Sequence, residues 1–496
     1  MKITLINPPV CWKDVYGKFE KVASFQAPIG LPALAAYLIQ YGHDLQIIDG
    51  NVPDDRGHDL TVEEIANEIG KYPPGLVGLY SISYNYKVFE ELAIAIRRAA
   101  PSVRIVAGGP HATFMPKETL RDTPVEFCCL GEAEESLHEL VQHLEDGATD
   151  FSDILGLAYR TAEGEIIVNS ERIVFKNLDD LPFPAIELLP SPERYKGYLL
   201  NQKRSPMMPM SSSRGCPYQC VFCETPSGKN FRANSAEWIV DLMELYVKKF
   251  GIKETTFLDD TFTVNEKRVF EICELKNKRN IDLTWFANAH AKVRNQDIFK
   301  AMRGAGAWLV SLGIESGSPK IIELLKKGTT REQMKATSQG ILDAKLKFKP
   351  LFILGNPGET LESIEETIQF AIDLKGHFPL FSIMTPFPGA PLWENAEEYG
   401  TFDRSSFSNL TITTSDPAFV PFGLTKEVLV KKQKEAFRRS YFNMDMARRH
   451  LMTLDNIEEL VKLVKASFTY LKVQFASINL QKKLNAHQFN ATFKRS

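Results

Sequence analysis

The sequence predicts an α/β protein with two successive series of alternating strands and helices, followed by a helical C-terminal region. Two observations support this prediction. Apolar runs of strand length alternate with helical patterns up to about residue 144, and the same alternation returns after residue 206. The stretch between them is rich in proline and poor in periodicity, as inter-domain connections are. Because parallel strands need long crossovers, both series indicate parallel sheets.

The first series predicts an open parallel sheet covered by helices on both faces, a flavodoxin-like (Rossmann-like) domain at residues 1–150. We expect strands at 2–7, 44–49, 76–83, 103–109 and 125–131, and helices at about 31–41, 61–71, 86–100 and 132–144. Ligands of such sheets bind at the carboxyl ends of the strands. The loops "SISYNY", "GGPHAT" and "GEAE" are therefore candidate ligand loops.

Residues 151–205 are predicted to form a linker that contains a β-hairpin, with Glu163 and Gly164 near its turn. The second series, at residues 206–400, begins with the strand-like "PMMPM". Further strands are expected at 254–260, 282–289, 308–316, 348–356 and 380–386, and helices near 235–250, 265–279, 295–304, 331–345 and 360–375. Six βα units are fewer than the eight of a complete TIM barrel, so we predict a partial (β/α)6 barrel with its chemistry at the C-terminal mouth.

Residues 401–496 are predicted to form a helical C-terminal domain. Amphipathic helices are expected from roughly 425 to 485, where positions such as Ile457 and Leu460 have helical spacing. Residues 1–150 carry 12 basic and 22 acidic side chains, whereas residues 424–496 carry 15 basic and 6 acidic ones. A basic tail can contact nucleic acid or anionic lipid, but most such helices simply face solvent. The tail shows no aromatic-interleaved recognition pattern, so nucleic acid is not an expected partner.

The overall composition is that of a globular protein, with 496 residues, 44% hydrophobic and 24% charged side chains. We expect no transmembrane segment, because apolar runs of about eighteen residues are missing. A Pro-Pro pair in "MKITLINPPV" interrupts the position of a signal-peptide core. Seven cysteines in so long a chain do not describe a disulfide framework. A cytoplasmic protein is therefore expected.

Three cysteines lie close together after the first strand of the second series. Cys216, Cys220 and Cys223 have the spacing C-x3-C-x2-C in "RGCPYQCVFC". Structural zinc and ordinary iron–sulfur clusters take four protein ligands, so three thiolates leave one coordination position open. An open position is what a reacting ligand needs at a catalytic metal site. A zinc half-site is the alternative interpretation.

In this position the motif, with Phe222 before its last cysteine, resembles that of the radical S-adenosylmethionine (SAM) enzymes. The resemblance implies that the three cysteines bind a 4Fe–4S cluster and that SAM binds its fourth iron. It also implies an electron donor such as flavodoxin or ferredoxin, and reductive cleavage of SAM to a 5′-deoxyadenosyl radical.

Further segments resemble the SAM-binding segments of that family, in the same order along the chain. "FLDD" corresponds to the segment for the SAM amino group, "LGIESGSP" to that for the ribose and carboxylate, and "FILGNPGET" to that for the adenine. The implied SAM-binding residues are Phe222, Asp259, Asp260, Glu315, Ser316 and Gly355. Asn356 departs from the pattern, because a leucine is more usual there. Lys292 falls where many relatives carry arginine, and we leave it out of the predicted site.

Structural roles are the alternative for several of these residues. Asp259 and Asp260 could be carboxylates at a helix N-terminus or at a strand end. Glu315 could be a buried, paired carboxylate of the barrel, and Phe222 could be a core aromatic side chain.

The first domain resembles the cobalamin-binding module that precedes many radical SAM enzymes. The segments "GLYSIS", "VAGGPHAT" and "LGEAEESL" carry this resemblance, and the two resemblances together cover about residues 1–390. The implied cobalamin-binding residues are Ser81, Ser83, Gly108, Gly109, Pro110, His111, Gly131 and Glu132. The glycine pair would let the backbone approach the cofactor. The D-x-H-x-x-G motif of other cobalamin proteins is missing, so we expect His111 to be a loop hydrogen-bonding group rather than a cobalt ligand.

These resemblances imply a cobalamin-dependent radical SAM enzyme, and methylation of an unactivated carbon is the commonest activity of that architecture. Cyclisation, ring contraction or dehydration by the same architecture is the first alternative. A metal-binding protein without chemistry and an RNA-modifying radical enzyme are alternatives from other classes. The aromatic stretch after residue 400 and the basic helices would suit a small-molecule or lipid-like substrate and a position peripheral to a membrane. They would equally suit a helical cap on the barrel.

Overall fold

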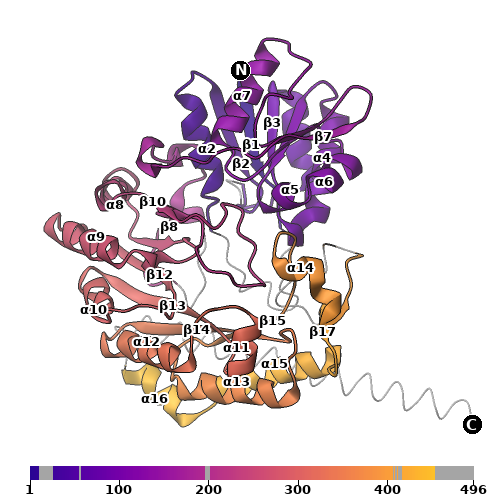
Figure 1. Cartoon of the computed structure of the whole chain (residues 1–496). Helices are drawn as coiled ribbons and strands as arrows, with labels where there is room; N and C mark the ends of the chain where they lie inside the picture. Colours follow the sequence, from indigo (N-terminus) through magenta and orange to yellow (C-terminus); the bar gives the residue numbers. More distant parts are fainter. Residues whose placement is uncertain are drawn as a thin grey trace, which may run out of the picture.

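The computed structural model describes residues 1–10, 26–54, 57–195, 202–405, 407, 410 and 416–452. Two large sheets follow one another along the chain, and each is accompanied by helices (Figure 1). The sheet of the first half lies at the top of Figure 1 and the sheet of the second half lies below it. The α/β prediction with two successive series is confirmed.

The first sheet has seven strands in the order β2-β1-β3-β4-β5-β6-β7. Its parallel strands are β1 (Lys2–Asn7), β2 (Asp44–Asp49), β3 (Leu76–Tyr80), β4 (Arg104–Gly108) and β5 (Phe127–Cys129). The order 2-1-3-4-5 of these strands is that of flavodoxin-like folds, whose topology switches between β1 and β3. The flavodoxin-like prediction is therefore confirmed.

Helices cover both faces of this sheet. They are α2 (Gly30–Ile39), α3 (Val62–Lys71), α4 (Tyr86–Ala99), α5 (Pro110–Phe114), α6 (Pro116–Asp122) and α7 (Glu134–Glu145). Helix α2 packs with α7, and α3 packs with α4. The start of α3 is fixed by a capping box in which Thr61 and Glu64 bind each other's backbone amides. Helices α5 and α6 were not predicted, because so few residues cannot show a helical period.

The predicted hairpin is present, and it belongs to the first sheet. It consists of β6 (Leu157–Arg160) and β7 (Ile166–Val168), and Gly164 has a positive φ in its turn. Strand β6 pairs antiparallel with β5, with Cys128 opposite Ala158. The hairpin at 157–168 therefore extends the first sheet, with β7 as its edge strand, and is not part of a free connector.

The second sheet has six parallel strands in the order β15-β14-β13-β12-β11-β8. They are β8 (Met207–Met210), β11 (Glu254–Phe257), β12 (Thr284–Ala289), β13 (Ala307–Glu315), β14 (Lys347–Leu354) and β15 (Leu380–Ile383). The helices of this series are α8 (Ala236–Phe250), α9 (Glu266–Lys278), α10 (Asp297–Gly304), α11 (Pro319–Leu324), α12 (Arg331–Asp343) and α13 (Leu361–Asp373). The six-stranded partial barrel is confirmed, and the short α11 was not predicted.

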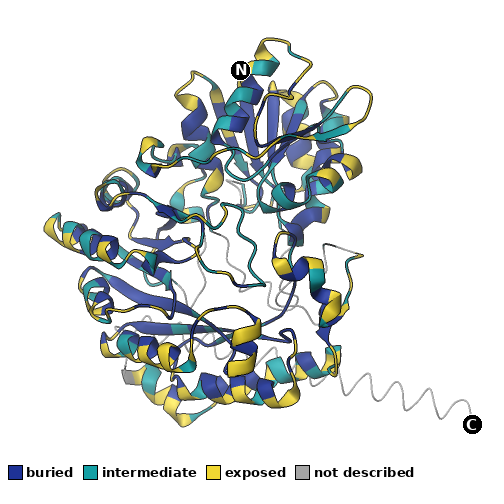
Figure 2. Ribbon diagram, in the orientation of Figure 1, coloured by how far each residue is buried: buried dark blue, intermediate teal, exposed yellow. Residues whose placement is uncertain are grey.

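Strand β14 shows how the two faces of this sheet differ. Phe348, Phe352 and Leu354 are buried, whereas the alternate residues Leu351 and Ile353 are half-buried. Phe352 stacks on Phe381 of β15, and Phe381 contacts Phe437 of an outer helix. Phe352 and Phe381 therefore face the helical layer, and Leu351 and Ile353 face the concave side. Figure 2 shows the strands as mostly buried and the outer helices with exposed faces.

The C-terminal region begins with α14 (Pro391–Asn395) and the hairpin of β16 (Gly400–Phe402) and β17 (Phe419–Pro421). Helices α15 (Lys426–Tyr441) and α16 (Met444–Met452) follow, and α15 packs against α13 and β15. The predicted helical positions Ile457 and Leu460 lie outside the described residues. Among the described residues, no helix is both long and apolar enough to cross a membrane.

Candidate active site

The three cysteines lie on one loop at the carboxyl edge of the second sheet. The loop joins β9 (Ser213–Arg214) to β10 (Arg232–Ala233), an antiparallel pair that follows β8. The Cys216 amide donates to the Gly228 carbonyl across 3.2 Å, and the Val221 amide donates to the Leu325 carbonyl across 3.1 Å. Gly215 has φ +79°, and a Cβ there would collide with the Asn230 carbonyl oxygen. The loop is therefore held on both sides and needs glycine at its start.

The three thiol groups differ in their surroundings. Cys220 is buried, and Cys216 and Cys223 are half-buried. A hydrogen bond from the Cys223 thiol, assisted by nearby Lys327, lowers the pKa of Cys220 to about 7. A thiolate is the metal-binding form of cysteine, so this environment favours ligation near neutral pH. Burial raises the pKa of Cys216, and the hydrogen bond to Cys220 raises the pKa of Cys223, so Cys220 is the thiol whose surroundings favour the thiolate. Three cysteines on one loop fit a 4Fe–4S cluster with three protein ligands. Within the described ranges, no three His, Cys, Asp or Glu side chains converge to hold a single metal ion.

Asp259 and Asp260 have different surroundings, although they are adjacent. The Asp259 carboxylate is buried and accepts hydrogen bonds from the Ser212 amide at 2.6 Å, the Ser212 hydroxyl at 2.5 Å and the Ser213 hydroxyl at 2.8 Å. Arg268 lies 3.6 Å from it. These contacts fix the segment before the cysteine loop, so they favour a structural role for Asp259. Asp260 is exposed to a cavity, and partial desolvation and the neighbouring Asp259 raise the pKa of its carboxyl.

Glu315 and Ser316 follow β13 and bind groups of the chain itself. Glu315 has φ +65°, a rare conformation for a non-glycine residue, at an irregular pairing of β13 with β14. Its Oε1 accepts a hydrogen bond from the Lys327 ammonium across 2.9 Å, and both side chains are buried. The Ser316 hydroxyl lies 3.0 Å from the Thr367 hydroxyl and accepts from the Ser318 amide. Both residues thus shape the turn after β13.

The turn after β14 is held by Glu359, a residue that the sequence analysis missed. The amides of Gly355 and Asn356 both donate to Glu359 Oε2, and Gly355 has φ +82°. Glu359 is buried, and desolvation raises its pKa to about 7. The Asn356 amide group donates to the Ile353 carbonyl across 2.7 Å, but its buried Oδ1 has no partner in the described part of the chain. The unusual Asn356 therefore stabilises the turn and leaves one acceptor free.

An aromatic contact links the cysteine loop to β12, and sequence reasoning missed it as well. The His290 ring, directly after β12, stacks on Tyr218 with 3.6 Å between ring centroids. Lys292 Nζ lies 5.5 Å from the centroid of the same tyrosine ring. Desolvation lowers the pKa of His290 to about 3, so the imidazole is neutral at pH 7. The position of His290 at the carboxyl end of a barrel strand was the signal that could have identified it.

Phe222 lies on the other side of the loop. It packs, half-buried, against an apolar cluster that contains Ile321, Leu325, Met384 and Leu392, together with Ile353. These contacts favour the core-aromatic interpretation of Phe222.

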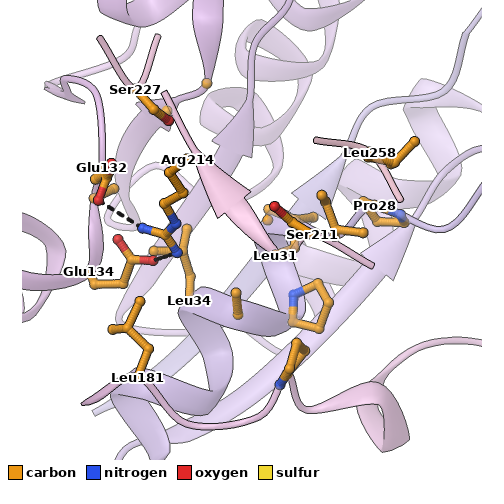
Figure 3. A pocket seen from close by; sticks show the side chains of 18 of the residues that line it. Pro28, Leu31, Leu34, Glu132, Glu134, Leu181, Ser211, Arg214, Ser227 and Leu258 are labelled. Carbon is orange, nitrogen blue, oxygen red and sulfur yellow. Dashed lines mark hydrogen bonds and ion pairs between the residues drawn. The ribbon is translucent and has the colours of Figure 1, made fainter. Parts of the chain in front are cut away.

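A cavity of about 350 Å³ lies where the two sheets meet. Loops of the first sheet line it with Gly108, Gly109, Gly131 and Glu132, and the second half lines it with Ser211, Arg214, Gly215, Ser227 and Asp260. Figure 3 shows Arg214 with Glu132 and Glu134 on one side of this cavity and Ser211 with Leu258 on another. The cavity thus combines residues predicted for cobalamin with one predicted for SAM. Ser81, Ser83, Pro110 and His111 do not line it.

Ion pairs hold the two sheets together beside this cavity. Arg214 donates to Glu132 across 2.9 Å and to Glu134 across 2.6 Å, and Arg232 also pairs with Glu132. The two glutamates follow β5, whereas the arginines belong to β9 and β10. Glu132, predicted to bind cobalamin, is therefore engaged between the two halves of the protein.

The loops after β3 and β4 form a buried polar layer behind the cavity. The Ser83 hydroxyl lies 3.0 Å from His111 Nδ1, and the His111 amide donates to the Ser81 carbonyl. The His111 ring contacts Tyr86 and Phe407, and desolvation lowers its pKa to about 4. The Ser81 hydroxyl and His111 Nε2 are buried without a partner in the described residues. These orphaned groups fit a polar ligand that reaches the layer.

Gly108 and Gly109 differ in whether their surroundings leave room for a side chain. Gly109 has φ +97°, and a Cβ there would lie 2.7 Å from the Tyr80 ring and 2.8 Å from the Ser81 carbonyl oxygen. At Gly108 a Cβ would meet nothing within 4 Å. The backbone conformation of Gly109 and the atoms around it thus require glycine at this position. At Gly108 there is open space on the cavity side. This space and the orphaned groups fit the cobalamin prediction.

Two family models match the chain. The Radical SAM superfamily model matches residues 210–371, and the B12 binding domain model matches residues 19–141. These ranges contain β11 to β14 of the second sheet and β2 to β5 of the first sheet, respectively. The family models therefore match in the order that the sequence predicted.

Relatives match over most of the chain. An uncharacterized methyltransferase, PH0819, of Pyrococcus horikoshii is 34% identical over 447 residues, which are 89% of this chain and 92% of the relative. The anaerobic magnesium-protoporphyrin IX monomethyl ester cyclase of Rubrivivax gelatinosus is 26% identical over 452 residues, 89% of this chain and 78% of the cyclase.

A solved structure matches the fold of both halves together. The cobalamin-dependent S-adenosylmethionine radical enzyme OxsB, with aqua-cobalamin and S-adenosylmethionine bound, superposes with a TM-score of 0.73 at 19% identity. The match covers 95% of this chain and 71% of OxsB. The predicted cofactors, a 4Fe–4S cluster, SAM and cobalamin, are those of this family. The chain therefore belongs to the radical SAM enzyme superfamily, within the group that carries a cobalamin-binding domain in front of the radical SAM domain.

Proposed function

We propose that this enzyme is a cobalamin-dependent methyltransferase that acts on an unactivated carbon of a small-molecule or lipid-like substrate. The cavity between the two sheets carries this proposal, because Gly108 and Gly131 of the first sheet share it with Arg214 and Asp260 of the second half. When bound, the cluster with SAM supplies hydrogen abstraction and cobalamin supplies the methyl group. Both must reach one substrate carbon, so the residues that hold them must meet at one place.

The assignment of residues to the cluster and SAM follows from their surroundings. Cys216, Cys220 and Cys223 hold the cluster. Asp260 binds the SAM amino group, because its carboxylate is exposed to the cavity and makes no hydrogen bond within the described residues. The free Asn356 Oδ1, next to Gly355, accepts a hydrogen bond on the adenine side.

The other residues predicted for SAM act through the loops that they hold. Asp259 positions the segment before the cysteines, and Glu315 and Ser316 position the turn after β13. Phe222 packs the cysteine loop against the barrel. We therefore propose them as positioning residues.

Residues in the loops after β3, β4 and β5 bind cobalamin. The backbone at Gly108 and Gly131 approaches the cofactor, and the Ser81 hydroxyl and neutral His111 Nε2 offer it hydrogen bonds. The neighbours Ser83, Gly109 and Pro110 hold these loops in place, and Glu132 aligns the two sheets.

Methylation is favoured over cyclisation because the relative named a methyltransferase is 34% identical to this chain, whereas the relative named a cyclase is 26% identical. Reductive cleavage of SAM needs a one-electron donor, and a flavodoxin or ferredoxin would supply it. We place the reaction in the cytoplasm, where thiols are kept reduced.

The stoichiometry of the SAM products tests this proposal. Methylation consumes two molecules of SAM, one as methyl donor and one for reductive cleavage. The full-length protein, reconstituted anaerobically with iron, sulfide and cobalamin, is incubated with SAM, a reductant and candidate substrates. We expect S-adenosylhomocysteine and 5′-deoxyadenosine in near-equal amounts, with a product heavier by one methyl group in place of hydrogen. Sustained 5′-deoxyadenosine formation without matching S-adenosylhomocysteine would assign the enzyme to cyclisation, ring contraction or dehydration instead.

A further inference from the structure

Lys349 lies in the middle of β14, on the concave face of the second sheet. Its neighbour Phe348 is buried on the opposite face, whereas Lys349 is half-buried like Leu351 and Ile353. Ile353 packs in the same apolar cluster as Phe222 of the cysteine loop. Because residues two and four positions apart share a face of a strand, Lys349 faces the side on which the cysteine loop lies.

The Lys349 ammonium makes no hydrogen bond or ion pair with any part of the chain that the structure describes. Protein atoms surround most of the side chain, and this desolvation lowers its pKa to about 8. Two buried lysines elsewhere in this half of the chain are paired: Lys327 with Glu315, and Lys276 of α9 with the Ile281 carbonyl. A buried ammonium without a partner is costly, so an unsatisfied lysine on a ligand-facing surface suggests a ligand that pairs with it.

The strand register places two further polar side chains in the same row. Ser311 of β13 lies opposite Lys349, and Asn288 of β12 lies opposite Ser311. The Asn288 side-chain amide also donates to the Asp259 carbonyl across 3.4 Å, which leaves its second N–H for a ligand. The next inward-facing row toward the cysteine loop contains Gly313, Leu351 and Leu380. A row of hydrogen-bond donors therefore crosses three strands. The side chains of the row above it are those of Leu351 and Leu380, and the paired Lys327 and Glu315 lie beside Gly313.

We propose that Lys349, together with Ser311 and Asn288, binds the carboxylate or phosphate group of a substrate whose apolar body lies against Leu351 and Ile353. This inference rests on the proposed function, since it names the chemical class of substrate for the same site. An ammonium, a hydroxyl and a side-chain amide can all donate to an oxyanion. The acidic group would be bound at the end of the substrate remote from the cysteine loop.

The strand geometry sets the size of the apolar body. At a rise of about 3.3 Å per residue, Ile353 lies about 13 Å from Lys349 along the strand. A substrate held at Lys349 therefore needs an apolar body of roughly this length to bring a carbon near the cysteine loop. An acidic lipid or an aromatic acid has the required combination of groups.

Binding of simple amphiphiles tests the inference without catalysis. The holoenzyme, loaded with SAM but without reductant, is titrated calorimetrically with octanoate, octyl phosphate and the neutral octanamide. We expect one or both anions to bind about tenfold or more tightly than octanamide, as a charge-assisted hydrogen bond predicts. The ratio between octanoate and octyl phosphate shows which acidic group the site prefers.

Two variants assign the preference to its residue. Lys349→Met keeps the length of the side chain and should reduce the preference for anions to near one. Lys345→Met removes an exposed lysine from the turn before β14 and should leave the preference unchanged. Lys349→Met should also melt at or above the temperature of the unmodified protein, because it removes a desolvated charge.

Equal binding of octanamide and both anions by the unmodified enzyme would overturn the inference, as would an undiminished preference in Lys349→Met. Because no SAM is cleaved in these titrations, their outcome is independent of the product stoichiometry. A retained anion preference in a protein that transfers no methyl group would support the anion site and count against the proposed function alone.

Discussion

Arg214 donates a hydrogen bond to Glu132 across 2.9 Å and so joins the strand before the cysteine loop to the loop after β5. Arg214 also binds Glu134, and Arg232 pairs with Glu132. The carboxylates of Glu132 and Glu134 are almost fully buried. A buried charge is stable only while it is paired, so this network fixes how the two sheets meet at the cavity.

Loss of one carboxylate from this network should destabilise the protein. Glu132→Gln leaves Arg232 buried with its main partner neutralised, and we expect the free energy of unfolding to fall by about 3 kcal/mol. Denaturant unfolding of the full-length protein measures this change. Glu271→Gln breaks an exposed pair with Lys267 and should cost less than about 1 kcal/mol. Equal losses in the two variants would contradict a role for the buried network.

Each of the three cysteines of the loop should be individually required for iron binding. Anaerobically reconstituted protein should contain about four irons per chain, because a cubane cluster with three cysteine ligands is the species that the loop fits. Cys216→Ala, Cys220→Ala and Cys223→Ala should each abolish stable iron binding and 5′-deoxyadenosine formation. Iron analysis and electron paramagnetic resonance measure the cluster. Cys273→Ala, at a buried position in α9, should retain it. Stoichiometric zinc without iron after reconstitution would refute the cluster assignment.

Substitution of Asp260 should affect SAM binding, whereas substitution of Asp259 should affect the stability of the protein. Asp260→Asn should weaken SAM binding while the melting temperature stays unchanged, because its carboxylate faces the cavity. Asp259→Asn should lower the melting temperature, because three hydrogen bonds and Arg268 depend on its charge. Equilibrium dialysis with labelled SAM and thermal unfolding provide the two readouts. A loss of SAM binding in Asp259→Asn alone would reverse the assignment.

Substitution of Gly108 should affect cobalamin binding, whereas substitution of Gly109 should affect the stability of the protein. Gly108→Val should reduce the cobalamin retained after gel filtration, because its side chain would enter the space on the cavity side. Its melting temperature without cofactor should change little. Gly109→Val should instead unfold at lower temperature, because it would clash with Tyr80 in a backbone conformation that favours glycine. Full cobalamin retention by Gly108→Val would mean that the cofactor does not approach this position.

His111 should affect the pH dependence of stability. Its pKa is about 4 in the folded protein and near 6.5 when unfolded, so the unfolded chain binds more protons between these values. Stability should therefore fall as the pH decreases from 7 to 5, with about 2 kcal/mol of the loss due to this residue. His111→Gln should reduce the loss by that amount, whereas His58→Gln, at an exposed position, should not.

The same variant tests the role of His111 toward cobalt. Because the imidazole is buried against Tyr86 and Phe407 and its Nδ1 faces Ser83, we expect it to be a hydrogen-bonding group. The visible spectrum of bound cobalamin should therefore stay nearly unchanged in His111→Gln. A shift to the spectrum of a cobalamin without its protein nitrogen ligand would assign His111 to the metal.

The order of strands and helices could be predicted because it depends on local patterns of apolar residues. The cysteine loop was identifiable for the same reason, since its three ligands lie within eight residues. The different surroundings of Asp259 and Asp260 could not be read in this way. They depend on Ser212 and Arg268, which only the fold brings to one of the two carboxylates.

Longer-range pairings were equally inaccessible from the sequence. Nothing in "GEAE" indicates that Glu132 meets Arg214 and Arg232, because these residues are about 80 and 100 positions away. Glu359 was missed because its function in the turn appears only when the amides of Gly355 and Asn356 point to it. Lys349 looked like any charged residue in a strand until the register placed it on the concave face.

The pairing of β6 with β5 has a practical consequence for dissecting the protein. A fragment ending at residue 150 would lack the hairpin and would expose the backbone donors and acceptors along β5, including those of the buried Cys128. Such an uncovered edge invites intermolecular strand addition and aggregation. A cobalamin-binding fragment should therefore extend beyond Val168, so that the natural edge strand β7 terminates the sheet.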